Sequence, residues 1–300
     1  MNKNLKEESG LTIDEESAIC VKNKQKSAPH LILQENKFSA KSSSPSRGEE
    51  TYRNNNRKCA FTLAEVLITL GIIGIVSAMT IPNLINKFEE KKTVSILKET
   101  YSMLSQAMIY VVNEHGIVDK WVKSNIQMSD DEFKDTVDTI LNYFKPYLRT
   151  TKICTAGEPS CIESDDNRIY RLNGTGHSWL NEAHYSSFVL LNGAKLLISV
   201  NSGSPIGMSC GRIQSAPCVF FHVKTDNAKK NVFGKNFFEF HVFNDRILPA
   251  GYKSTYYYSF PSECQLTTSG RGCTAWVIEN GNMDYLHCDD LSWDGKRKCD

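Results

Sequence analysis

The chain has 300 residues, of which 40% are hydrophobic and 23% charged, and its formal net charge is +1 at pH 7. This composition is ordinary for a folded protein and excludes a chain that is disordered throughout. Residues 1–60 hold eleven Lys and Arg against eight Asp and Glu, so the rest of the chain is mildly acidic. An acidic body lacks the positive field on which nonspecific nucleic-acid binding depends, and we expect no nucleic acid among its partners.

Residues 1–60 are predicted to be a disordered leader. The segment is polar and contains runs such as Ser42-Ser43-Ser44-Pro45-Ser46 and Asn54-Asn55-Asn56. It has few apolar clusters, so the burial of apolar surface cannot offset the entropy lost on ordering.

Residues 61–81 are predicted to span a membrane once. From Phe61 to Ile81 the sequence reads FTLAEVLITLGIIGIVSAMTI, and Glu65 is its only charged residue. As a helix this stretch is about 31 Å long, which matches the roughly 30 Å hydrocarbon core of a bilayer. Arg53, Arg57 and Lys58 precede it. Because positive charge stays on the cytoplasmic side, the N-terminus is expected in the cytoplasm and the body outside.

Residues 82–116 are predicted to continue the same helix as an amphipathic segment. Pro82 removes one backbone donor, so we expect a kink or local melting there. Residues then recur at steps of three and four, the spacing of one helix face, with Lys91 as the only break in an apolar stripe. Gly116 supplies the stop after His115. The stripe comprises Leu84, Phe88, Lys91, Val94, Leu97, Tyr101, Leu104, Met108 and Val111.

Residues 117–300 are predicted to form a globular α+β head. A helix is expected from Asp130 to about Lys145, opened by a Ser129–Glu132 capping box. Asn192-Gly193 between two apolar runs indicates a β-hairpin. The fold class is therefore α+β, with the second half of the long N-terminal helix packed on a small antiparallel sheet tied by disulfides. The expected strands are 187–191, 194–200, 219–224, 237–243 and 274–279.

Eight of the ten cysteines lie beyond the apolar run, and Cys20 and Cys59 lie in the leader. An even number of cysteines on the side predicted to be outside indicates disulfides. Eight cysteines allow 105 connectivities, so pairing between nearest neighbours rests on proximity alone. A zinc site through His287 and Cys288 is the alternative for the last pair. The close pairs are Cys154/Cys161, Cys210/Cys218, Cys264/Cys273 and Cys288/Cys299.

The boundary Ala60-Phe61-Thr62-Leu63-Ala64-Glu65 resembles the type IV prepilin family, which includes the pseudopilins of type II secretion. In that family a basic leader ends in Gly, followed by Phe-Thr-Leu-x-Glu and an apolar stretch of about twenty residues. The match covers Phe61, Thr62, Leu63, Glu65, the apolar run and Pro82. The chain departs from the family in two ways, because Ala60 replaces the usual Gly and the leader is far longer than most.

The resemblance implies a life cycle. A prepilin peptidase would cut between Ala60 and Phe61 on the cytoplasmic face and methylate the new Phe61 amine. Glu65 would be the assembly residue and would pair with the Phe61 amine of a neighbouring subunit, since a carboxylate inside a membrane span is costly unless it is paired. The partners would be membrane lipid first, then the inner-membrane assembly platform and other pilin-like subunits in a helical fibre. The protein would lie in the bacterial inner membrane, and later in a periplasmic or cell-surface fibre.

Several functions follow from this pattern. The first is a structural subunit, pilin or pseudopilin, of a type IV pilus or type II secretion fibre. The second is a minor tip subunit or a membrane-anchored envelope protein that binds a surface or ligand. For the apolar run itself, an ordinary membrane anchor and a secretory signal cleaved near Val76-Ser77-Ala78 are the simpler interpretations.

An enzyme is not expected. Ser204 does not sit in a G-x-S-x-G elbow, and His177, His184, His222 and His241 have no nucleophile pattern near them. No cofactor is expected either, and the one candidate for a bound ion is calcium. Polar loops in some type II pseudopilin heads hold Ca²⁺, and Asp226 and Asn236 occupy a similar segment here. Asn236 stands at an acidic position of that pattern, although hard cations prefer several charged oxygens.

Overall fold

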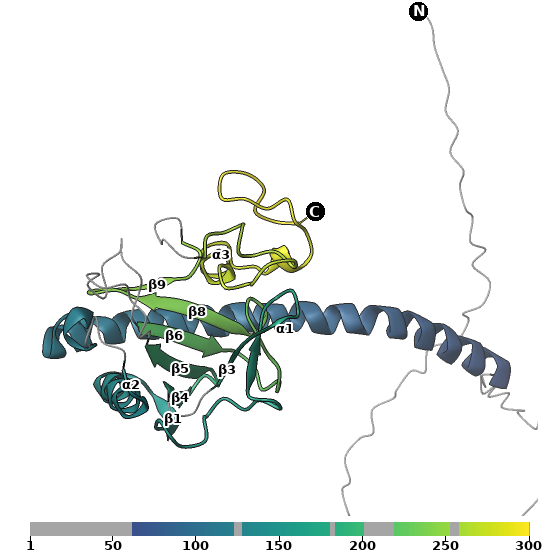
Figure 1. Ribbon diagram of the computed structural model, residues 1–300. Coiled ribbons are helices and arrows are strands. Elements are labelled where there is room, and N and C mark those ends of the chain that lie inside the picture. The colour runs from purple at the N-terminus through teal and green to yellow at the C-terminus, as the bar shows by residue number, and fades with distance from the viewer. Residues whose placement is uncertain (1–61, 123–127, 181–183, 201–218, 253–257, 300) are drawn as a thin grey trace, which may run out of the picture. The chain divides into compact units, whose positions relative to one another are not determined.

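A computed structural model describes residues 62–122, 128–180, 184–200, 219–252 and 258–299 of the chain (Figure 1). The chain divides into two compact units, residues 1–78 and 79–300, and each is described by itself. Helix α1 (Leu63–His115) begins in the first unit and ends in the second. The predicted leader, 1–60, lies outside the described residues.

Helix α1 is unbroken at Pro82. The local melting that the sequence suggested there is not seen, because a proline in a helix removes one hydrogen bond without necessarily ending the helix. The helix stops where predicted, at His115. Gly116 follows with a φ of +79°, and its amide donates to the Val112 carbonyl at 2.9 Å. A positive φ at this position is accessible to glycine at little cost.

The second unit is built on an antiparallel sheet in the order β1-β4-β5-β6-β8-β9, which Figure 1 shows with α1 crossing behind it. The hairpin predicted around Asn192-Gly193 is formed by β4 and β5, and β6 covers the predicted range. This arrangement confirms the α+β class. The strands are β1 (Thr150–Cys154), β4 (Ser186–Leu190), β5 (Lys195–Val200), β6 (Val219–Lys224), β8 (Phe237–Val242) and β9 (Ile247–Pro249).

One face of this sheet packs on α1 and on α2 (Asp130–Phe144). The Tyr101 ring of α1 stacks on Phe240 of β8 with centroids 5.5 Å apart, and its hydroxyl donates to the Ile247 carbonyl at 3.3 Å. Phe144 of α2 meets Phe221 of β6 edge-on at 5.0 Å. Helix α2 begins with the predicted Ser129–Glu132 capping box.

The predicted stripe of α1 is buried only in part. Leu84 and Phe88 are 69% and 65% exposed, and burial on the head begins at Thr93 and Val94. The periodicity was correct as a helix face, but a face is buried only where another element lies opposite it. The first two members of the stripe therefore extend the exposed apolar surface.

The opposite face of the large sheet is covered by a second, three-stranded sheet that the sequence did not predict. Its order is β3-β2-β7, with β2 and β7 parallel. Ile169 of this sheet packs in one cluster with Leu197 of β5 and Phe237 of β8. Both faces of the central strands are consequently buried. The small strands are β2 (Arg168–Tyr170), β3 (Gly176–Trp179) and β7 (Asn231–Val232).

The predicted strand 274–279 is wrong, because this segment is helix α3 (Cys273–Asn280). Thr274, Trp276, Val277 and Ile278 are residues that favour strands, but a short apolar run does not distinguish a strand from a buried helix. The segment is a helix packed beside β8 and β9 with residues 273–277 buried. Gly281 closes it in the left-handed conformation.

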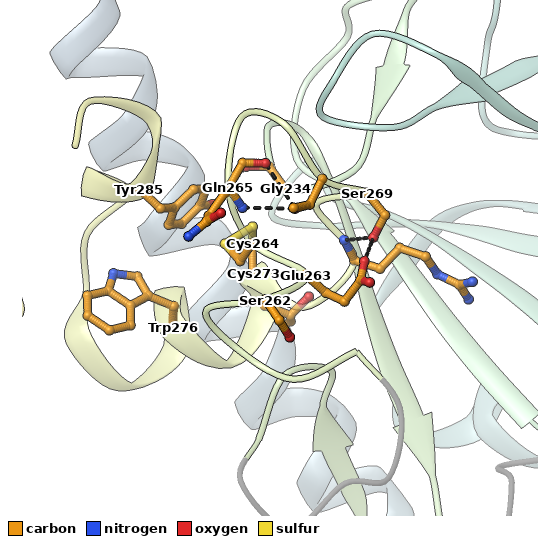
Figure 2. The surroundings of a disulfide bond; sticks show 12 residues. Gly234, Ser262, Glu263, Cys264, Gln265, Ser269, Cys273, Trp276 and Tyr285 are labelled. Carbon is orange, nitrogen blue, oxygen red and sulfur yellow. Dashed lines mark hydrogen bonds between the residues drawn. A yellow bond between two sulfur atoms is a disulfide. The ribbon is translucent and has the colours of Figure 1, made fainter. Parts of the chain in front are cut away.

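Disulfides join Cys154–Cys161, Cys264–Cys273 and Cys288–Cys299, which are three of the nearest-neighbour pairs. Cys210 and Cys218 lie outside the described residues, as do Cys20 and Cys59. Figure 2 shows the second disulfide between Trp276 and Tyr285 on one side and Glu263 and Ser269 on the other. Gly234 lies so close that a Cβ there would be 2.8 Å from the Cys273 sulfur.

The Cys264–Cys273 disulfide closes a loop that holds Arg271 over a buried carboxylate. Glu239 of β8 is fully buried, and Arg271 donates to its Oε2 through Nε at 2.8 Å and through Nη2 at 2.6 Å. His241 and His222 contact its two oxygens at 2.9 and 3.3 Å. Burial raises the pKa of Glu239, but the Arg271 guanidinium and the two histidines outweigh it and hold the pKa well below its ordinary value. Glu239 is therefore a buried anion neutralised by Arg271.

Replacing Arg271 should cost the head much of its stability. In Arg271→Met the Glu239 carboxylate is left buried without its cation, which typically costs about 3–5 kcal/mol. Adding Glu239→Gln should restore most of that loss, since no unpaired charge remains. Arg246→Met is the matched control, because Arg246 pairs with Asp245 at the surface, where ion pairs contribute little. Urea unfolding of the full chain in micelles, followed by tryptophan fluorescence, measures all four proteins; equal losses for Arg271→Met and Arg246→Met would contradict the assignment.

Candidate functional site

Helix α1 begins with a capping box between Thr62 and Glu65. The Glu65 amide donates to the Thr62 Oγ1 at 3.2 Å, and the Glu65 carboxylate accepts from the Thr62 amide at 2.8 Å and from its hydroxyl at 2.7 Å. This is the reciprocal arrangement of a Thr-x-x-Glu cap, in which two amides without helical partners are both satisfied. Ala60 and Phe61, the predicted processing residues, lie outside the described residues.

The first half of α1 exposes apolar side chains on all sides. Between Leu63 and Phe88 the large hydrophobic residues are 41% to 78% exposed. One helix of the described residues, α1, is long and apolar enough to cross a membrane. A continuous apolar surface of this kind is not stable in water and must be covered by lipid or by protein. Glu65 is the only charged residue in this surface between Thr62 and Ile81.

Residues 55–81 match the family model of the prokaryotic N-terminal methylation motif, the signature of type IV pilins and pseudopilins. The match spans the end of the leader and the apolar half of α1, and it does not reach the head. No curated protein and no solved structure matches the chain. The chain thus carries the signature of a membrane-anchored precursor of the pilin or pseudopilin type, and the family marked by this motif is structural rather than catalytic.

The capping role of Glu65 is the feature that sequence reasoning missed. The signal was present, because Thr62-Leu63-Ala64-Glu65 has the same spacing as Ser129-Asp130-Asp131-Glu132, which was recognised as a capping box. The sequence pattern assigns Glu65 to assembly alone, as a carboxylate inside a membrane span that pairs with the Phe61 amine of a neighbouring subunit. In the structure its carboxylate has a partner in its own chain, so a role in assembly must be separated from a role in starting the helix.

The calcium candidates do lie together, but in an arrangement that does not suit a cation. Asn236 directs its amide nitrogen, not its oxygen, to both carboxylate oxygens of Asp226, each at 3.0 Å. The ammonium of Lys224 lies 3.2 Å from Asp226 Oδ1 on another side. The carboxylate of this pair of candidates is therefore engaged by nitrogen donors in this arrangement.

The zinc alternative is also not supported by the geometry. Cys288 is bonded to Cys299, so its thiolate is not free for a metal. His287 instead contacts Glu90 of α1 at 2.8 Å. Among the residues that the structure describes, no group of three or more His, Cys, Asp and Glu is placed to hold a metal ion.

The neighbours of the four histidines His177, His184, His222 and His241 are carboxylates and aromatic rings. His222 and His241 contact Glu239, and His184 contacts Asp130 of α2 at 2.9 Å. His177 packs edge-on against Phe233, and burial together with nearby Arg271 and Arg171 lowers its pKa to about 4. Ser204 lies outside the described residues. These contacts hold segments of the head together.

The cap at Thr62 should control the first turn of α1. Thr62→Val removes the acceptor of the Glu65 amide, and the loss of an N-cap costs about 1 kcal/mol, or roughly five-fold in local opening. We expect the Glu65 amide to exchange with deuterium about that much faster in micelles. Thr69→Val is the matched control, because the Thr69 hydroxyl only donates back to the Glu65 and Val66 carbonyls. An unchanged Glu65 exchange rate in Thr62→Val would show that the cap does not contribute.

Proposed function

We propose that the mature chain is a structural subunit of a type IV pilus or type II secretion fibre. A prepilin peptidase removes residues 1–60 on the cytoplasmic face of the inner membrane and methylates the Phe61 amine. The apolar half of α1 then holds the subunit in the bilayer with its N-terminus in the cytoplasm and its head outside. An assembly platform transfers it into a helical fibre, in which apolar halves of neighbouring α1 helices replace the lipid.

One observation carries the proposal: residues 55–81 match the methylation motif at the start of a helix whose first half has no protein cover within the described chain. The head adds support from its chemistry. Three disulfides are expected in an oxidising compartment, which agrees with a head outside the cytoplasm. The basic residues before Phe61 agree with a cytoplasmic N-terminus.

Processing can be tested directly. The mature protein should begin at Phe61 with an N-methylated amine and should contain neither Cys20 nor Cys59. Mass spectrometry of the N-terminal peptide from membranes identifies this end. A mature protein that begins at Met79 would show cleavage after Ala78 by a signal peptidase and would overturn the fibre subunit.

The charge of Glu65 can be separated from its capping role. Glu65→Gln keeps a capping box, since Gln is accepted at this position, but removes the negative charge. Glu65→Leu removes both, and Thr62→Val weakens the cap while leaving the charge. If Glu65 neutralises the Phe61 amine of the next subunit, both Glu65 variants should be inserted and cleaved yet enter fibres poorly, because the buried ammonium is left unpaired.

The measurement compares membrane level, processed size and the amount in sheared fibres for the three variants and the unchanged protein. Thr62→Val should assemble nearly normally. Normal assembly of Glu65→Gln together with failure of Glu65→Leu would assign Glu65 to the cap alone. Normal assembly of both would refute any role in the fibre and would favour a simple membrane anchor.

A further inference from the structure

The loop between β6 and β8 folds around the side chain of Lys224, the last residue of β6. The Lys224 side chain is fully buried. Its Nζ lies 2.5 Å from the Ala228 carbonyl, 2.7 Å from Asn231 Oδ1 and 3.2 Å from Asp226 Oδ1. The three oxygens come from three positions of one loop and converge on one nitrogen.

This geometry suits an ammonium group. Three oxygen acceptors around one nitrogen need three N–H donors, which a lysine provides only when it is protonated. The orientation of Asn231 agrees with this, because its Oδ1 faces Lys224 while its buried Nδ2 has no partner among the described residues. A positive charge favours this orientation, since hydrogen bonds to a charged donor are stronger than those between neutral groups.

The oxygens around Lys224 are of the kinds that bind hard cations: a carboxylate, an amide oxygen and a backbone carbonyl. A metal ion has no place among them, because the ammonium occupies their centre and repels a second cation. Asp226 also accepts from the Ala228 amide at 3.2 Å and from Asn236. Asn236 is held in turn, since its Oδ1 accepts from the Val232 amide at 2.8 Å.

We propose that the Lys224 ammonium is the internal cation of this loop and does the ordering that a bound metal ion would otherwise do. Burial lowers the pKa of Lys224 and so opposes the charged form, while the Asp226 carboxylate acts in the opposite direction. The three oxygens therefore offset a real desolvation cost, as metal ligands do. The head needs no divalent cation for this loop.

The ordered loop lies against the part of α1 that follows the apolar span in sequence. The Thr225 hydroxyl, next to Lys224, donates to the Thr93 hydroxyl of α1 at 3.4 Å. Residues of the loop and residues 86–93 of α1 line one groove of about 890 Å³. Lys224 thus orders the loop that forms one wall of this groove.

Hydrogen–deuterium exchange of the full chain in micelles tests the proposal. In the unchanged protein, the Ala228 and Val232 amides should exchange at the same rate in excess calcium and in excess EDTA. Lys224→Met keeps the length of the side chain and removes the charge, and it should speed exchange of these amides roughly ten-fold or more. Lys229→Met is the matched control, because Lys229 is exposed in the same loop and pairs with Asp165 at the surface; it should leave the rates unchanged.

Acetylation of the native, unchanged protein gives a second readout, which needs no variant and so cannot fail because a variant does not fold. Lys224 should react far more slowly than Lys229, as its ammonium is buried and fully bonded. Slower loop exchange in calcium than in EDTA with Lys224 intact would mean that a metal ion orders the loop. Unchanged exchange in Lys224→Met, or equal acetylation of Lys224 and Lys229, would show that the ammonium does not organise it.

Discussion

The rest of the structure depends on one constraint: a single helix must fit two environments, an apolar one around its first half and the folded head around its second half. The first half of α1 exposes apolar side chains all round, whereas residues from Thr93 onward bury one face on the sheet of the head. Burial of apolar surface drives both halves, but only the second finds its cover within the described chain. The first half is complete only in lipid or among other helices, so the fold itself requires an association. A precursor with the methylation motif at this position fits that requirement.

The head solves a different problem on the two faces of its sheet. The face toward α1 is closed by apolar and aromatic packing, as between Tyr101 and Phe240. On the other face charged side chains are buried. There Arg271 neutralises Glu239, and the Cys264–Cys273 disulfide closes the loop that holds Arg271. Lys224 is a second buried charge on this face, but of positive sign, and oxygen atoms of a loop surround it. Charges buried with complete sets of partners tolerate few alternative arrangements, so they specify how the loops cross the sheet.

Elements with a strong local signal were predictable from the sequence. The membrane-length run, the capping box of α2 and the hairpin at Asn192-Gly193 each follow from residues close together in the chain. The second sheet was not predictable, because strands as short as β7 have no period to detect. Helix α3 was mistaken for a strand, since its β-branched and aromatic residues are compatible with a buried strand and with a buried helix. The partners of Lys224 could not be foreseen either, because the sequence does not say which polar side chain of a loop turns inward.

The disulfides have a consequence for how the head is made. The three described bonds join cysteines only 7, 9 and 11 residues apart in sequence. Loops of about ten residues close in roughly 10–100 ns, far faster than the rate at which a chain is synthesised. The two cysteines of each of these pairs can therefore meet before the sheet is complete. Among these six cysteines any other pairing joins residues 15 or more positions apart, as with Cys273 and Cys288, so the native pairs have the shortest loops to close.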